Sequence, residues 1–261
     1  MCIRDRIASV GTRFTYLGKP DLALRLARTA YLGLRHDPQS RPRALTRLII
    51  CLFTQMKPRG RRETVLLGQA DRLAFSTGDL YTRYSHLSNK ALWSMDQGHW
   101  DEAEALLKGA ARFIGGPDTV AARRLAVNRA IFEIRRGRTL AAEEYLLEIE
   151  PWMPTPQASM NALYDACNLL VFLEMGQLAR AAALHEKLGD LDMRFPYGSD
   201  LAMVPLARAF YLRRIGKRPV AISLLQEAVD GFRRHNPAAA RRLRDAIERG
   251  IDQGGLGNFC S

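Results

Sequence analysis

The segment GHWDEAEALLKGA, residues 98–110, decides the fold of this chain. It opens on a glycine that is followed five residues later by an alanine, and this spacing recurs along the 261 residues. The glycines are Gly18, Gly60, Gly98, Gly137, Gly176 and Gly216, so subtraction of successive numbers gives steps of 42, 38, 39, 39 and 40 residues. The residues five positions later are Ala23, Val65, Ala103, Ala142, Ala181 and Ala221. A repeat of this length indicates a stack of similar supersecondary units.

Each repeat is predicted to be an antiparallel pair of helices. Glycine readily adopts the left-handed backbone that ends a helix, and a small residue on the next helix lets the two helices pack closely. The first helices are predicted over 7–17, 41–57, 79–97, 118–136, 157–175 and 200–215, and the second over 20–35, 62–77, 100–114, 139–150, 178–190 and 219–234. A last helix over 237–250 would cap the stack. The predicted fold class is all-α, an α-solenoid of about six helix hairpins with a C-terminal capping helix.

The quoted segment resembles the tetratricopeptide signature through Gly98, Trp100, Ala103 and Ala110. The steps between repeats exceed the roughly 34 residues of that family. The chain is more similar to the longer TPR-like superhelical repeats of large ATP-dependent bacterial transcriptional activators of the maltose-regulator type. This resemblance implies a TPR-like superhelix that serves as a ligand-sensing or partner-binding arm. HEAT repeats have a similar length and remain the alternative fold.

Three segments are expected in the domain organisation. Residues 7–250 are predicted to form a single solenoid domain, and the glycines at 254, 255 and 257 predict a flexible tail over 251–261. The first six residues, MCIRDR, resemble an adapter-derived leader of assembled reading frames. On that interpretation residues 1–6 are foreign and the chain is a fragment, while a native start is the alternative.

Composition indicates a globular protein of a reducing compartment. The four cysteines, Cys2, Cys51, Cys167 and Cys260, stand singly without a CxxC pair, which predicts a cytoplasmic protein rather than a disulfide framework. The resemblance to the activators implies that the protein is bacterial. No apolar run approaches the roughly 18–20 residues of a membrane span, so no membrane partner is expected.

No motif in the sequence predicts catalysis. There is no P-loop, HExxH or GxSxG segment, and the five histidines are isolated from other ligand types. The glutamates at 143, 144, 148 and 150 are interpreted as a solvated helix face rather than as an acid catalyst or metal site. We therefore expect a protein that is not an enzyme, with no cofactor and no metal.

Charge is distributed unevenly along a chain whose formal net charge is +12. Residues 1–62 hold 14 basic and 3 acidic groups, residues 139–200 hold 3 and 10, and residues 201–261 hold 11 and 5. The acidic middle would interrupt a continuous phosphate-binding track, which argues against nucleic acid as the partner of this segment. In a solenoid this order becomes a spatial order that suits docking to a charged partner or to a neighbouring domain of a longer chain. Solvation of the surface by an arginine-rich composition is the alternative.

Polar and aromatic residues at fixed distances before the turn glycines share one side of the predicted first helices, roughly opposite the side that meets the second helix. They predict a concave groove that holds a peptide or small ligand by stacking and charge. Packing between repeats is the alternative for the aromatic residues, and solvation is the alternative for the cations. The candidates are His86, Asn89, Lys90, Trp93, Asn128, Arg129, Phe132, Tyr164, Asn168, Arg208 and Tyr211.

Two functions are compatible with these patterns. The first is a non-catalytic interaction scaffold, of use in signal transduction, that binds a peptide or protein partner in the groove of its first helices. The alternative is a domain cut from a larger bacterial transcription regulator, where it would sense a small-molecule effector or control oligomerisation. Salt-sensitive binding is expected of the scaffold, and thermal stabilisation by a metabolite is expected of the sensor.

Overall fold

The computed structural model describes residues 20–34, 36–37, 40–41, 44–45, 47–48, 51, 65, 68, 71–72, 74–75, 80–116, 118–190, 199–233 and 237–249. The chain divides into two compact units, which are described separately below. Unit 1 comprises Met1–Ile114, Phe195–Gly198 and Arg234–Ala238, and unit 2 comprises Gly115–Arg194, Ser199–Arg233 and Ala239–Ser261. The prediction of a single domain over 7–250 stays a prediction.

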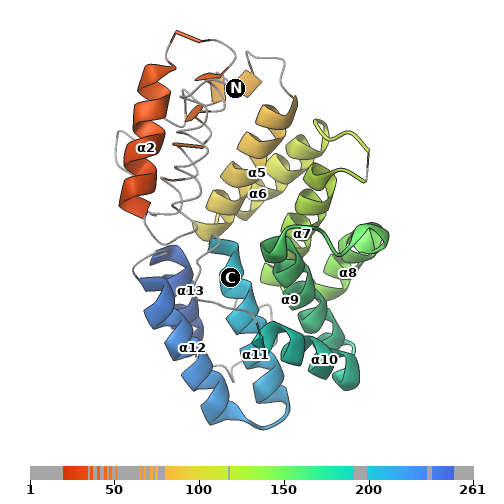
Figure 1. The fold of residues 1–261 in the computed structure, drawn as a ribbon. Helices are drawn as coiled ribbons and strands as arrows, with labels where there is room; N and C mark the ends of the chain where they lie inside the picture. Colours follow the sequence, from red (N-terminus) through yellow and green to blue (C-terminus); the bar gives the residue numbers. More distant parts are fainter. Residues whose placement is uncertain are drawn as a thin grey trace. The chain divides into compact units, whose positions relative to one another are not determined.

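Every regular element in the described part of the chain is a helix, as the repeat predicts (Figure 1). Unit 1 contains α2 (Pro20–Gly33), α5 (Leu80–Asp96) and α6 (Trp100–Ala111). Unit 2 contains α7 (Val120–Arg135), α8 (Thr139–Ile149), α9 (Ala158–Glu174), α10 (Leu178–Gly189), α11 (Met203–Arg214), α12 (Arg218–Arg233) and most of α13 (Pro237–Glu248). Two short 3₁₀ helices, η1 (Glu150–Trp152) and η2 (Ser199–Ala202), lie before α9 and α11.

The predicted helix boundaries agree with these elements to within about three residues. The solenoid-like, all-α class is therefore confirmed for the described residues. The predicted helix over 7–17, the turn glycines Gly18 and Gly60, the leader over 1–6 and the tail over 251–261 lie outside those residues. The predicted helices over 41–57 and 62–77 are described only at scattered positions.

The turn glycines end their helices in the left-handed conformation that the repeat requires. The φ angles are +75° at Gly98, +72° at Gly137, +72° at Gly176 and +79° at Gly216. At Gly137 two backbone hydrogen bonds close the turn, because Arg138 N donates to Glu133 O at 2.8 Å and Gly137 N donates to Ile134 O at 2.9 Å. The same bond pair occurs at the other three glycines. This is the Schellman arrangement, which satisfies carbonyls that the helix end leaves unpaired.

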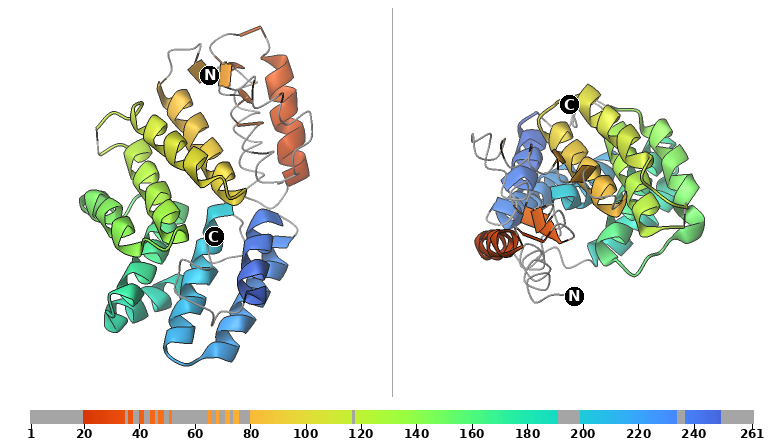
Figure 2. Two further views of the ribbon diagram at one scale, coloured as in Figure 1. Left: turned by 180° about the vertical axis from the view of Figure 1, so that it is seen from behind. Right: turned by 90° about the horizontal axis from the view of Figure 1, so that it is seen from above.

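The small residue five positions after each of these glycines lies at a helix contact. Ala103, Ala142, Ala181 and Ala221 are all completely buried. Each belongs to the second helix of a pair that packs together, namely α5 with α6, α7 with α8, α9 with α10 and α11 with α12. The left view of Figure 2 shows α11 and α12 side by side from behind. A larger side chain at these positions would separate the helices, so the alanines explain the close pairing.

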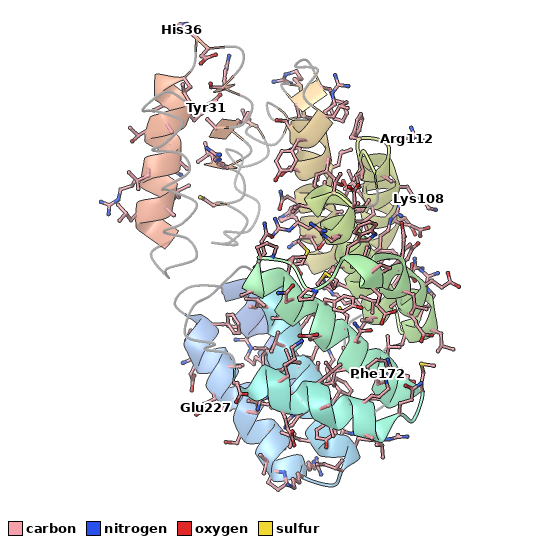
Figure 3. The ribbon with its side chains drawn as sticks, turned by 45° about the vertical axis from the view of Figure 1, so that its right-hand side comes forward. Tyr31, His36, Lys108, Arg112, Phe172 and Glu227 are labelled. Carbon is pink, nitrogen blue, oxygen red and sulfur yellow. The ribbon has the colours of Figure 1, made fainter. Side chains whose placement is uncertain are left out.

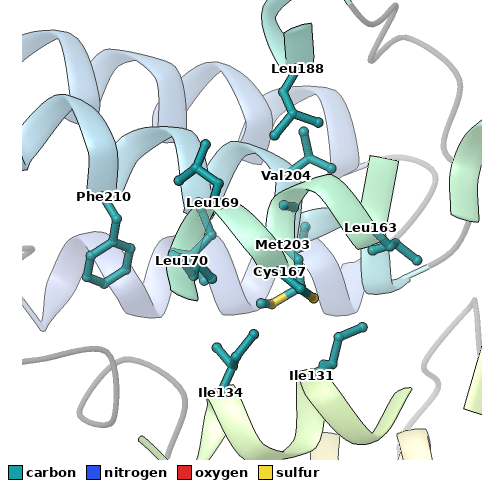
Figure 4. Close-up of a cluster of buried hydrophobic side chains, with 14 of the residues drawn as sticks. Ile131, Ile134, Leu163, Cys167, Leu169, Leu170, Leu188, Met203, Val204 and Phe210 are labelled. Carbon is teal, nitrogen blue, oxygen red and sulfur yellow. The ribbon is translucent and has the colours of Figure 1, made fainter. Parts of the chain in front are cut away.

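Within unit 2 the first helices form the buried layer. α9 packs against α7 and against α11, and the second helices α8 and α10 both contact α9. Eleven of the 17 residues of α9 and eight of the 12 residues of α11 are buried, against two of the 12 residues of α10. Figure 4 shows this core, in which Ile131 and Ile134 face Cys167, and Leu188 lies beside Val204. The burial explains why α9 is apolar nearly all round.

A loop of prolines joins α8 to α9 and is held by a reciprocal pair of hydrogen bonds. Thr155 N donates to Asn161 Oδ1 and Asn161 Nδ2 donates to Thr155 O, both at 2.8 Å. Thr119 provides a second local anchor, because its Oγ1 accepts from Ala122 N at 3.1 Å and caps the start of α7. The Thr119 contact caps the start of α7, and the Thr155–Asn161 bonds fix the loop to the first turn of α9.

Among the residues that the structure describes, no helix has the length and apolar character that crossing a membrane requires.

Candidate functional site

The candidate residues His86 and Lys90 of unit 1 both contact Asp71. His86 Nε2 lies 2.6 Å from Asp71 Oδ1, and Lys90 Nζ lies 3.1 Å from Asp71 Oδ2. The hydrogen bond with His86, aided by Lys90 and opposed by burial, holds the pKa of Asp71 below its ordinary value of 3.8. His86 is only 1% exposed. The group therefore joins α5 to the segment that carries Asp71 and offers no imidazole to a partner.

Asn89 and Trp93, also on α5, are partly buried and engaged locally. Asn89 Nδ2 donates to the carbonyl of Ser85 at 2.7 Å, one turn earlier. The indole of Trp93 meets the ring of His99 edge-on, with centroids 6.4 Å apart and an interplanar angle of 78°. Both side chains remain partly exposed, so they keep a surface for contact. His99 was not among the candidates.

The three candidates on α7 have different environments. Asn128 and Phe132 are buried, so they belong to the interior of unit 2, and packing is the role that the structure gives Phe132. Arg129 is partly buried, and its guanidinium lies 5.3 Å from the centroid of the Tyr145 ring of α8. This cation–π contact orients the side chain without neutralising its charge.

On α9 the candidates Tyr164 and Asn168 lie one turn apart, and both are partly buried. Asn168 Nδ2 donates to the carbonyl of Tyr164 at 3.1 Å. Burial is the main cause that raises the pKa of the Tyr164 phenol above 10.0. A neutral phenol can both donate and accept a hydrogen bond. Neighbouring Asp165 points to α10 instead, where it pairs with Lys187 at 2.7 Å.

The two candidates on α11 form a group with His185 of α10. The ring of Tyr211 stacks on the imidazole of His185, with centroids 4.5 Å apart and planes 29° apart. The Arg208 guanidinium lies beside the end of α10, because its Nη2 is 3.2 Å from the position that a Cβ at Gly189 would take. We call His185, Arg208 and Tyr211 the Arg208 cluster.

Two polar nitrogen atoms of the Arg208 cluster lack hydrogen-bond partners. Arg208 Nε and His185 Nδ1 are both buried and bond to nothing in the described part of the chain. Burial, followed by the charge of Arg208, lowers the pKa of His185, so this imidazole is neutral near pH 7. Burial also lowers the pKa of Arg208, which Asp190 opposes. Arginine nevertheless stays protonated at neutral pH because the ordinary pKa of a guanidinium lies far above 7.

The Arg208 cluster combines side chains of three different chemistries. It presents a fixed cation, a neutral imidazole and the face of a tyrosine, which suit an anionic group attached to a flat or apolar body. Within the described ranges no group of three or more His, Cys, Asp and Glu side chains is placed to hold a metal ion. The predictions that the protein has no cofactor and is not an enzyme stay predictions.

The candidates predicted from sequence include Arg208 and Tyr211 but not His185, on which Tyr211 stacks. Positions relative to the turn glycines reveal which residues share one helix face, whereas the stack joins residues of two different helices. Asp71 was missed for the same reason, since its bonds to His86 and Lys90 join separate segments. No spacing within one helix signals either contact.

Comparison by sequence provides no relatives: no family model matches the chain, and no curated protein matches it. Comparison by structure finds a similar fold in BtubC (BKLC) from P. vanneervenii. The TM-score is 0.54 and the sequence identity 16%, and the alignment covers 97% of this chain and 95% of that chain. At this identity the similarity shows the fold alone.

Proposed function

We propose that this chain is a non-catalytic binding scaffold that holds a peptide or protein partner on the first helices of unit 2. The observation that carries the proposal is the state of Arg208. Its side chain is partly buried, and its Nε is buried without a hydrogen-bond partner in the described part of the chain, while Asp190 is the acidic group that acts on its charge. A buried polar group without a partner costs free energy, and a bound anion would offset that cost.

The partner chemistry follows from the three side chains of the Arg208 cluster. A carboxylate, from an acidic side chain or a peptide C-terminus, can accept hydrogen bonds from the Arg208 guanidinium. The stacked rings of Tyr211 and His185 provide an adjoining apolar surface for the residue that carries the carboxylate. The partly exposed Tyr164 and Asn168 of α9 extend the contact along the neighbouring first helix.

The proposal includes the finer identity of the repeats as TPR-like. It is supported by turn glycines at φ near +75° that recur every 39 or 40 residues, and by alanines that are buried where paired helices meet. The proposed compartment is the bacterial cytoplasm, which is supported by the free thiols of Cys51 and Cys167 in the described residues. Regulation of transcription or signalling through the bound partner is the biological role that we infer for such a scaffold.

The test is selection of binders from a phage-displayed random peptide library on the intact protein, followed by titration of the selected peptides. Arg208→Gln keeps much of the side-chain volume but removes the charge, so we expect at least about a tenfold loss of affinity, the size of a charge-assisted contact. Arg214→Gln is the matched control on the same helix, because Arg214 is exposed, and it should leave the affinity unchanged. Selected peptides that bind wild type and Arg208→Gln equally would contradict the proposal.

The effect of salt concentration on binding distinguishes the proposed scaffold from the alternative, a small-molecule sensor. Peptide affinity at Arg208 should fall as ionic strength rises, because a partly exposed ion pair is screened. A small-molecule sensor would instead show a melting temperature that rises with a metabolite at all salt concentrations. A melting-temperature screen with a metabolite collection, run at low and high salt, distinguishes the two outcomes.

A further inference from the structure

The outer face of α8 carries two large apolar side chains that the fold leaves uncovered. Leu140 is 64% exposed and Leu147 is 56% exposed. They are seven residues apart, so they lie on one side of the helix about 10 Å from each other. Trp152 of η1, which follows α8 directly, is 44% exposed. We call Leu140, Leu147, Trp152 and the glutamates among them the α8 face.

Negative charge surrounds these apolar side chains. Glu144 and Glu148 are exposed on the same side of α8, and Glu143 is partly exposed beside them. None of the three forms a hydrogen bond or ion pair with a residue that the structure describes. Residues 139–152 contain no Lys, Arg or His that could neutralise them.

Arginines in and beside α7 have contacts other than these glutamates, and one of them, Arg123, donates from Nη1 to the carbonyl of Trp152 at 3.5 Å. Arg138, just before α8, pairs with Glu133 of α7 at 2.6 Å. Arg129 lies over the Tyr145 ring at 5.3 Å, and Arg136 lies over the Phe132 ring at 5.4 Å. The ring contacts leave the charges of Arg129 and Arg136 in place, but neither arginine forms an ion pair with Glu143, Glu144 or Glu148 in the described part of the chain.

We propose that the α8 face is a second docking surface, separate from the Arg208 cluster, and that its occupant is a basic amphipathic helix of a partner protein. Leucines seven residues apart match the two-turn spacing of apolar residues on another helix. The unpaired glutamates complement lysines or arginines that flank such an apolar stripe. The same glutamates repel the phosphates of nucleic acids and of acidic lipids, which leaves a basic protein segment as the fitting partner.

The test is fluorescence anisotropy of a labelled synthetic helical peptide with a leucine stripe flanked by lysines, titrated with the full chain. The matched probe carries glutamates in place of the lysines. We expect the lysine peptide to bind and the glutamate peptide to bind at least about tenfold more weakly, because charge complementarity selects the partner. Equal binding of both peptides would overturn the proposal.

Three double variants locate the site at which the peptide binds. Leu140→Ser with Leu147→Ser should lower the affinity for the lysine peptide at least about tenfold, since the peptide would lose its apolar contact with both leucines. Val220→Ser with Ile222→Ser on α12 is the control, because these side chains are 53% and 37% exposed outside the α8 face. Glu144→Gln with Glu148→Gln should weaken binding at low salt and have little effect at high salt. Equal losses in the leucine and control variants would overturn the proposal.

Analytical ultracentrifugation of the protein alone shows whether a second copy of this chain, rather than a partner protein, occupies the α8 face. If the chain forms a dimer that Leu147→Glu dissociates, the α8 face is a self-association surface and the proposal is wrong. A wild-type monomer that binds the lysine peptide supports it. Arg208→Gln should leave the affinity of the lysine peptide for the α8 face unchanged. The proposal for the α8 face can therefore fail without the proposal for the Arg208 cluster failing, and the reverse.

Discussion

At the scale of single residues, burial decides which polar side chains serve structure and which remain available. His86 and Asp165 are buried and matched to a neighbour, by Asp71 in unit 1 and by Lys187 in unit 2 respectively. Arg208 is partly buried, and its Nε has no hydrogen-bond partner in the described residues. An ion pair offsets part of the free energy that burial of a charged side chain costs. A buried polar atom without a partner keeps that cost, so it remains available to a ligand.

The ion pair between Asp165 and Lys187 predicts a pH-dependent effect. Burial raises the pKa of Asp165 above 3.8, and Lys187 opposes that shift. Lys187→Met should destabilise the fold by about 1–2 kcal/mol near neutral pH, a small value because the lysine is mostly exposed. Urea unfolding at a series of pH values measures the difference.

The sign of the pH dependence follows from the raised pKa. Between 3.8 and its higher folded value, Asp165 binds its proton more tightly in the folded chain, so its contribution to stability falls as pH rises through that window. Without Lys187 the window extends to higher pH, so the loss should shrink as the pH is lowered towards 3.8. Asp165→Asn in both backgrounds is the control and should remove the pH dependence. A loss that stays constant with pH would contradict this account.

At the scale of elements, a helix pair is defined by its turn and by its contact alanine. The turn requires a positive φ, and the contact requires a side chain no larger than a methyl group. At Gly98, Gly176 and Gly216 an added Cβ would meet nothing within 4 Å. Glycine is therefore required at these turns by backbone conformation rather than by lack of space.

This distinction predicts opposite effects for two glycine substitutions. Gly176→Ala should destabilise by about 1–2 kcal/mol, because an L-residue is strained in the left-handed region. Gly231→Ala should instead stabilise by roughly 0.5–1 kcal/mol, because Gly231 lies within α12 with open space around it. Thermal unfolding of both variants measures the effects. A stabilised Gly176→Ala variant would show that this turn does not need its positive φ.

At the scale of the whole molecule, the chain has two compact units and an uneven distribution of charge. In unit 2 the acidic stretch coincides with α8, α9 and α10, and its unpaired glutamates lie on the α8 face. The first helices of that unit are buried by neighbours on several sides, whereas the second helices bury one stripe each. Stability in unit 2 should therefore be concentrated in its first helices.

Hydrogen exchange measures this gradient directly. We expect the backbone amides of α9 and α11 to exchange slowest in unit 2, because opening either helix exposes the core shown in Figure 4. Amides of α10 and α12 should exchange faster, since those helices bury only two of 12 and four of 16 residues. Figure 3 shows Glu227 of α12 on the outside of this layer. Uniform exchange across the four helices would mean that unit 2 opens only as one cooperative block.

The sequence by itself determined the helix pairs, because glycine conformation and alanine size act over a few residues and recur at a fixed spacing. Gly137 and Ala142, for example, were recognisable without any long-range contact. Only the tertiary structure decided which candidates face inwards and which polar groups find partners. Helices that meet in space bury Phe132 and Asn128 and stack His185 on Tyr211. They also bury Arg208 Nε without a hydrogen-bond partner in the described residues. Desolvation and pairing are set by those neighbours, and no periodicity within one helix encodes them.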